Sequence, residues 1–324
     1  MTWRRIVTIL ALLLLPLSLS GQTKWYKFNK AFITQHFSSG SAIGTLQADE
    51  AHAAHTVHSV SCGGNDGELH IGIPGNAVVS SNAAGQPISG VAGQTNSDFG
   101  VVAEPPNAST ALKNGLVAAD GQAAQFVGYF RVWNEGHDVG AIHPSNPHHV
   151  VELHPVWGIQ MGSVNNAPDG SVVFSMPNYH GYGASKFRPL LESASNWLKV
   201  YEDPQFVYVQ MPKAQNFYQT RVKIKQVKPY AGGQAAVADV FSSASGPRVF
   251  QNLTLVAAAG SDVGNRFVVG QSMFLLGFFS VNLSKAAQLA QGHSGAAAAI
   301  SAPGALEFFA FGLPTGRATT TCSN

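Results

Sequence analysis

The 324-residue sequence has only two cysteines, Cys62 and Cys322, and few charged residues. Charged side chains make up 11% of the chain, well below the roughly 25% of a typical soluble protein. This low charge favours a β-rich exported architecture over a highly charged helical protein. An even pair of cysteines in an exported chain predicts a disulfide between Cys62 and Cys322, with two unpaired thiols as the alternative.

The sequence also lacks the motifs that would assign it to a common enzyme class. It has no Gly-x-Ser-x-Gly elbow, phosphate-binding loop or dinucleotide-binding fingerprint. A helical His-Glu-x-x-His and a Cys-x-x-Cys are absent as well. The candidate chemistry therefore depends on residues that only the fold can bring together.

The N-terminal stretch "MTWRRIVTILALLLLPLSLS" combines two arginines, a short apolar run and a small-residue cleavage pattern. This pattern is typical of a secretory signal peptide over residues 1–20, and predicts a secreted or periplasmic protein. The run is too short for a stable transmembrane anchor. Cleavage removes two of 19 basic residues and leaves 17 against 17 acidic ones, so net charge does not attract nucleic acid or membranes.

The remaining length predicts two domains. We expect a leader segment over residues 21–50, an OB-like β-barrel domain over 51–165 and a β-rich C-terminal domain over 166–324. In the first half, three β-like stretches, "HTVHSVSC", "ELHIGIP" and "FGVVAEPP", precede a helix in "NASTALKNGLVAAD", and "AQFVGYFRVWN" and "HHVVELHPVWGI" follow it. The turn "GGNDG" predicts that the first two stretches form a hairpin. Three strands, a helix and two strands resemble the order of the OB-fold, a five-stranded barrel.

The second half predicts a β-rich sandwich or barrel with one or two helices. Strand patterns include "PQFVYVQMP", "QTRVKIKQVK" and "SMFLLGFFSVNL". In "PLLESASNWLKVYED", Leu190, Ala194, Trp197, Leu198 and Tyr201 recur at helical spacing, which predicts one amphipathic helix.

The tripeptide Glu-Leu-His occurs twice, at Glu68 and His70 and at Glu152 and His154. Alternation on a strand places the two polar residues of each copy on one face. In an OB-like order both copies flank the strand that ends at Glu104. Imidazole and carboxylate groups suit zinc or manganese, and these five residues are the candidate metal ligands.

Two alternative roles for these residues stay open. The Glu and His side chains could satisfy one another by hydrogen bonds inside the barrel, or they could form a metal-free ligand or acid-base site. His137, Asp138, His148 and His149 could add ligands or a general base, whereas the edge carrying His52, His55 and His58 is more simply a solvated one.

A second candidate site lies on the fourth strand of the first domain. Tyr129, Arg131 and Trp133 alternate there, and His137 follows in the next loop. Aromatic residues on a barrel face can stack sugar rings or bases, which predicts a ligand-binding face. The alternative is that this face fills the barrel.

The stretch "FVGYFRVWNEGHDVGAIHPSNPHHVVELHPVWGI", with "DGELHIGI" and "VVAEPP", resembles segments of exported bacterial proteins with an OB-like barrel and an "ELHPV" strand. The resemblance covers about residues 55–160 and implies no particular activity. Because stringent catalytic motifs are absent and the candidate face combines aromatic and polar residues, we expect a secreted binding or interaction protein of unknown ligand. A polymer such as an oligosaccharide or, less favoured, single-stranded nucleic acid is the candidate ligand. The alternatives are a metal-dependent hydrolase using the Glu/His cluster and a self-assembling cell-surface or filament subunit.

Overall fold

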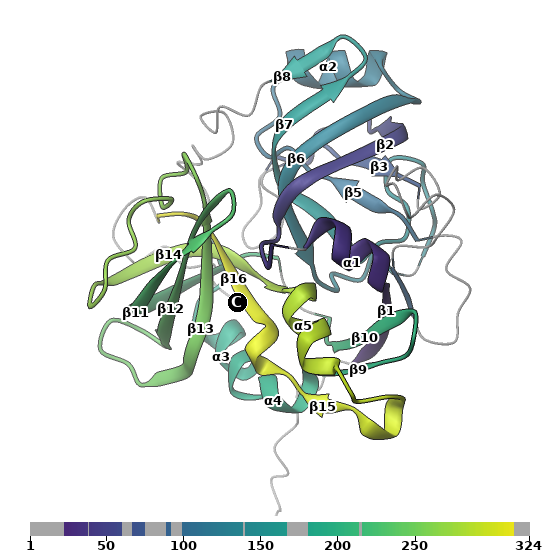
Figure 1. Cartoon of the computed structure of the whole chain (residues 1–324). Coiled ribbons are helices and arrows are strands. Elements are labelled where there is room, and N and C mark those ends of the chain that lie inside the picture. Colours follow the sequence, from purple (N-terminus) through teal and green to yellow (C-terminus); the bar gives the residue numbers. More distant parts are fainter. Residues whose placement is uncertain are drawn as a thin grey trace, which may run out of the picture.

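The computed structural model describes residues 23–37, 39–59, 67–74, 89–91, 99–138, 140–166, 181–213 and 216–313. This part of the chain is mainly β, as predicted, and forms two closed barrels and a third sheet (Figure 1). Residues 1–20, Cys62 and Cys322 lie outside the described residues. The signal peptide and the disulfide between the two cysteines therefore stay predictions. None of the described helices is long and apolar enough to cross a membrane.

The first barrel confirms the predicted OB-like order, but its first strand lies at Ile43–Ala53, before the stretch beginning at His55 that the sequence predicts for it. Its strands are β2 (Ile43–Ala53), β3 (Ile71–Ile73), β5 (Val101–Ala103), β6 (Gln122–Val132) and β7 (Val151–Met161), with β8 (Val164–Asn166) added beside β7. They pair in the order β5-β3-β2-β6-β7, and a parallel pairing of β5 with β7 closes the ring. Helix α2 (Thr110–Ala118) connects the third strand to the fourth, and the side chain of Ser109 caps its N-terminus.

The second barrel resolves the choice between sandwich and barrel. Its strands are β11 (Tyr218–Tyr230), β12 (Gly233–Phe241), β13 (Arg248–Ala258), β14 (Ser272–Val281) and β16 (Leu306–Gly312). They close in the order β11-β12-β13-β16-β14, with β13 and β16 parallel. Both barrels therefore have the same strand order around the ring. Counted along the chain, this order is first, second, third, fifth, fourth. Helix α5 (Leu283–Ala290), however, follows the fourth strand rather than the third.

A third sheet joins segments from along the whole chain. Its order is β15 (Ile300–Ser301), β9 (Lys199–Glu202), β10 (Phe206–Met211), β1 (Lys24–Asn29) and β4 (Ser89–Val91). The prediction of a leader over residues 21–50 is corrected here. Tyr26 and Phe28 alternate into the core as part of β1, helix α1 (Lys30–His36) follows, and the first barrel already begins at Ile43.

The single amphipathic helix predicted for the second half is also corrected. The chain forms α3 (Ala184–Glu192) and a short α4 (Ala194–Trp197), and then enters strand β9. Tyr201 pairs with Tyr208 of the neighbouring strand β10 instead of continuing the helix. The backbone hydrogen bonds of the third sheet therefore override the helical spacing of the apolar residues.

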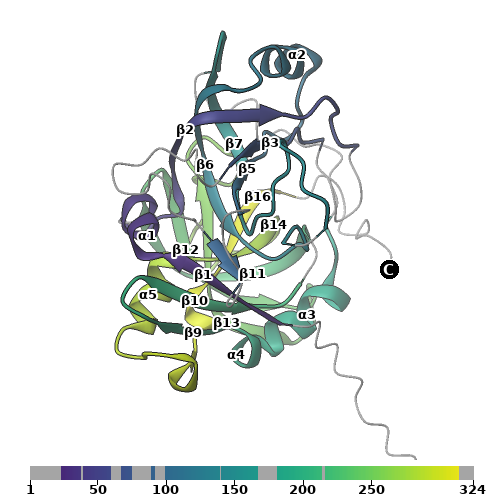
Figure 2. The same ribbon diagram turned by 90° about the vertical axis from the view of Figure 1, so that its right-hand side faces the viewer.

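Strand β6 links the two barrels. Its first half alternates, with Ala124 and Phe126 buried, whereas every residue from Gly128 to Val132 is buried. The second half is covered because it packs on strand β14: the N–H of Val132 donates to Oγ of Ser280 at 3.0 Å. Both views show the first barrel at one end of the molecule and the second barrel and third sheet at the other (Figures 1 and 2).

Candidate metal centre

The segment before strand β3 carries the first Glu-Leu-His copy. Its extended backbone continues the pairing of β2 with β3, since the N–H of His58 donates to the carbonyl of Glu68 at 2.9 Å and that of Ala54 to the carbonyl of His70 at 2.9 Å. Leu69 points the other way and is fully buried, as the alternation predicts. Glu68 and His70 thus share one face.

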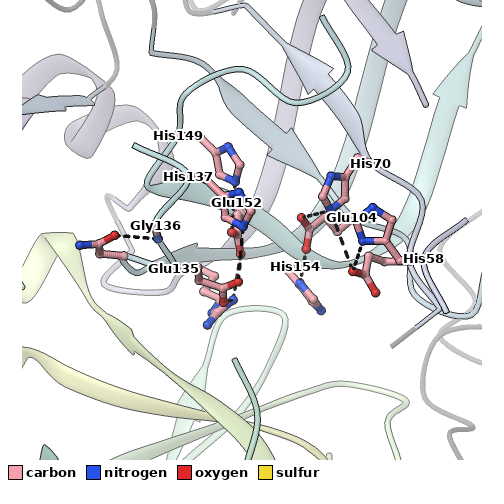
Figure 3. A network of polar contacts seen from close by, with 12 residues as sticks. His58, His70, Glu104, Glu135, Gly136, His137, His149, Glu152 and His154 are labelled. Atoms are coloured by element: carbon pink, nitrogen blue, oxygen red, sulfur yellow. Dashed lines mark hydrogen bonds and ion pairs between the residues drawn. The ribbon is translucent and has the colours of Figure 1, made fainter. Parts of the chain in front are cut away.

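The closing pair of strands brings the second copy beside Glu104. Glu152 and His154 lie on β7, and the parallel pairing sets Val102 opposite Glu152. Glu104 directly follows β5, where its N–H donates to the carbonyl of Leu153 at 2.9 Å. The five predicted ligands, which are the Glu and His residues of both copies together with Glu104, therefore meet in one cluster (Figure 3).

One half of this cluster is centred on Glu104. Oε1 of Glu104 lies 3.1 Å from Nε2 of His70, and Oε2 lies 2.5 Å from Nδ1 of His154. Oε1 of Glu68 lies 3.1 Å from Nδ1 of His58 and 3.9 Å from Nε2 of His70. The imidazoles of His58 and His70 have their ring centroids 4.3 Å apart.

The other half is centred on Glu152. Oε1 of Glu152 lies 3.3 Å from Nε2 of His149, and Oε2 lies 3.0 Å from Nη1 of Arg131. The same guanidinium nitrogen pairs with Glu135. The ring of His137 stacks on that of His149 with centroids 4.9 Å apart and an interplanar angle of 9°.

The protonation of the His149 ring follows from its backbone contact. Nδ1 of His149 lies 2.7 Å from the carbonyl oxygen of Pro147. A carbonyl only accepts, so Nδ1 carries the proton and donates. Nε2 of His149 is buried and makes no hydrogen bond within the described part of the chain, although it faces the carboxylate of Glu152.

The cluster is rich in negative charge. Four carboxylates, those of Glu68, Glu104, Glu135 and Glu152, stand against the single guanidinium of Arg131, so the formal charge is −3 with neutral histidines. The four carboxylates and the guanidinium are all buried or nearly buried. Uncompensated buried charge is costly, so this arrangement favours cations or bound protons.

The pKa shifts in the Glu104 half reflect the excess of negative charge. Burial raises the pKa of Glu104, but the imidazoles of His70 and His154 outweigh burial and hold it well below its usual value. Burial lowers the pKa of His70, but the carboxylate of Glu104 outweighs it, so the net shift is upward. In the absence of a cation, the carboxylates thus favour protonated imidazoles.

The Glu152 half behaves in the same way. Burial lowers the pKa of His149, but Glu152 outweighs burial and the net shift is upward. Burial raises the pKa of Glu135 to about 7 despite the neighbouring Arg131. A carboxyl beside a guanidinium normally has a lowered pKa, so burial outweighs Arg131 here, and the carboxylates of Glu152 and Glu104 add to the upward shift.

The predicted ligand-binding face on β6 is corrected. Tyr129, Arg131 and Trp133 are buried because they pack against the second barrel. The guanidinium carbon of Arg131 lies 4.6 Å from the centroid of the Phe278 ring. His137 remains half-buried at the rim of the cluster, with 40% of its side chain exposed.

Two histidines of the cluster, His58 and His149, fall outside the five ligands predicted from the sequence. His58 sits on a segment that pairs with residues 68–70, as the hairpin predicted from the sequence implies, but the spacing of its histidines predicts only a solvated edge there. His149 is a possible additional ligand in the sequence, and its i, i+3 spacing to Glu152 is the available signal. Its neighbour His148 instead points away, toward the carbonyl of Gly140.

A separate cavity of about 430 Å³ lies between α3, β13 and the turn before β16. Its lining includes Leu191, Arg248, Phe250 and Pro303, and no residue of the Glu-His cluster.

Comparison with protein-family models and with curated proteins gives no match for this chain. The Glu-His cluster is therefore interpreted from its own chemistry.

Proposed function

We propose that the protein binds a divalent transition metal ion, such as zinc or manganese, in the Glu-His cluster. The spacing of the ligand atoms carries this proposal: Nε2 of His70 lies 3.1 Å from Oε1 of Glu104 and 3.9 Å from Oε1 of Glu68. Two ligands that each lie about 2.1 Å from one ion are about 3.0 Å apart at a right angle and about 3.4 Å apart at a tetrahedral angle. These side chains therefore need little movement to share an ion.

The chemistry of the donors supports the same function. Imidazole nitrogens and carboxylate oxygens are borderline and hard ligands, which suit zinc, manganese and iron. Metal-bound histidines commonly donate their other ring N–H to a backbone carbonyl, and His149 does so to Pro147. A dication would also compensate much of the formal charge of −3.

A second candidate function is metal-dependent hydrolysis. The side chain of His58 is 36% exposed, so solvent reaches one side of the ion proposed beside it. A divalent ion with an open position lowers the pKa of its bound water to about 7 and so supplies a nucleophile at neutral pH. We do not retain polymer binding on β6, because Tyr129 and Trp133 are buried.

Metal content tests the binding function. We expect the full chain, stripped with chelator and dialysed against zinc chloride, to retain zinc in elemental analysis and to melt at a higher temperature. His70→Ala should retain less zinc than the wild type, because it loses a ligand atom close to both Glu104 and Glu68. His55→Ala is the matched control, because His55 is exposed and lies three residues from His58. Zinc retention that is equal in His70→Ala and wild type would overturn the proposal.

A further inference from the structure

We propose that the cluster holds two divalent ions and that the carboxylate of Glu104 lies between them, an inference that rests on the metal-binding function proposed above. Two sets of donors share no residue: His58, Glu68 and His70 form one, and Glu104, His149 and Glu152 form the other. Within each set, one ligand atom from every residue lies within 4.8 Å of the others. Each set can therefore surround an ion of its own.

Glu104 connects the two sets. It belongs to the second set, yet its Oε1 lies 3.1 Å from Nε2 of His70 in the first (Figure 3). Nδ1 of His154 holds the other oxygen, Oε2, at 2.5 Å and so fixes the direction of the carboxylate. A carboxylate placed in this way bridges two ions about 3.5–4 Å apart, the usual separation in two-metal sites.

The second ion is placed by two facing acceptor atoms that need a cation or a proton between them. Nδ1 of His149 donates to the carbonyl of Pro147, so the neutral ring directs the lone pair of Nε2 toward Oε1 of Glu152, 3.3 Å away. Two acceptors that face each other repel unless a cation or proton lies between them. Arg131 binds the other oxygen of Glu152 and leaves Oε1 for the ion.

The charge of the cluster favours two ions over one. With all four carboxylates ionised and the histidines neutral, the formal charge is −3, and a single dication leaves one buried negative charge that only a bound proton balances. Two dications with one bridging hydroxide balance the cluster. Because uncompensated buried charge is costly, the balanced state is the more stable one.

The two ions differ in their access to solvent. The first is bounded by His58, whose side chain is 36% exposed. In the second set the side chains of His149, Glu152 and Glu104 are only 1%, 3% and 6% exposed. We therefore expect the first ion to exchange quickly and the second slowly, since an enclosed site releases its metal only when the surrounding structure opens.

Ion stoichiometry and spin coupling test this inference in the full chain. Stripped protein is dialysed against zinc chloride for elemental analysis and, separately, against manganese chloride for low-temperature electron paramagnetic resonance. We expect two ions per wild-type chain and a signal from exchange-coupled manganese. His58→Ala and His149→Ala should each keep one ion and give an uncoupled signal, while His55→Ala should match the wild type.

The outcomes separate the two proposals. One ion in the wild type, lost in both His58→Ala and His149→Ala, overturns the two-ion centre and leaves metal binding intact. No bound ion in the wild type overturns metal binding itself. Two ions in His58→Ala also overturn the two-ion centre, and because His58 is half-buried at the rim, this variant decides the question if His149→Ala does not fold.

Discussion

Nδ1 of His154 donates to Oε2 of Glu104 at 2.5 Å, and the same imidazole packs edge-on against Phe217 and Phe278 of the second half of the chain. The carboxylate at the centre of the cluster is thus oriented by a side chain wedged between the two barrels. The position of Glu104 therefore depends on the packing of both halves, not on the first barrel alone.

Removing this orienting contact should weaken metal binding. In His154→Leu the apolar packing is largely kept but the donor to Glu104 is lost, and we expect the zinc affinity to fall about 10- to 100-fold. His154→Asn restores an N–H donor and should lose less. Competition with a zinc-binding dye measures both affinities, and wild-type affinity in His154→Leu would contradict an orienting role.

Arg131 should matter most when the metal is absent. Its guanidinium is fully buried between Glu152 and Glu135, so Arg131→Met leaves two carboxylates unpaired. We expect a loss of about 3–5 kcal/mol in the free energy of unfolding in chelator, and a smaller loss in zinc, which compensates the carboxylates. Urea denaturation in both conditions measures the difference.

The exposed pair of Arg188 and Glu192 provides the control for Arg131. These side chains are 51% and 45% exposed, so Arg188→Met should change the free energy of unfolding by about 0.5 kcal/mol or less. Equal losses for Arg131→Met in chelator and in zinc would show that the ion does not offset the removed charge.

Glu307 should make stability depend on pH at the barrel interface. Oε2 of Glu307 accepts from the hydroxyls of Tyr129 and Tyr230 at 3.2 and 3.3 Å, and Oε1 accepts from Asn282 at 2.9 Å. Burial raises its pKa from 4.5 to about 7. Between these values the folded chain holds more protons than the unfolded chain, so rising pH destabilises the fold.

Glu307→Gln isolates this effect because glutamine does not titrate. The free energy of unfolding of the wild type relative to the variant should fall by roughly 3 kcal/mol between pH 4.5 and pH 7 and then level off. Denaturant unfolding of both proteins across this range measures the difference. A difference that stays constant with pH would show that Glu307 does not titrate in this range.

Trp133 should act through stability rather than through ligand binding. Its ring lies 5.9 Å from that of Trp197 and 6.3 Å from that of Phe279, at the junction of the barrels and α4. Trp133→Ala should therefore cost about 3–5 kcal/mol of unfolding free energy. A stable Trp133→Ala variant with lost affinity for an oligosaccharide would instead support the binding face predicted from the sequence.

The first barrel could be predicted because its signals are local. Strand alternation and the order of strands and helix fix the OB-like arrangement, and the alternation also places Glu68 with His70 and Glu152 with His154. The parallel pairing of β5 with β7 then brings Glu104 between them. None of these steps needed knowledge of the second half.

The features that could not be predicted depend on distant contacts. The aromatic stripe of β6 looks like a binding face until strand β14 covers it, and the apolar spacing around Trp197 looks helical until Tyr201 pairs with β10. Such pairings are set by tertiary packing, which overrides local preference.

Anomalous diffraction at the zinc absorption edge, from crystals of the full chain grown with zinc, tests metal binding in this cluster most directly. We predict two anomalous peaks, one about 2.0–2.1 Å from Nε2 of His70 and one at the same distance from Nε2 of His149. A map whose peaks lie only at exposed histidines such as His55, with none beside His70 or His149, would contradict the proposed metal centre.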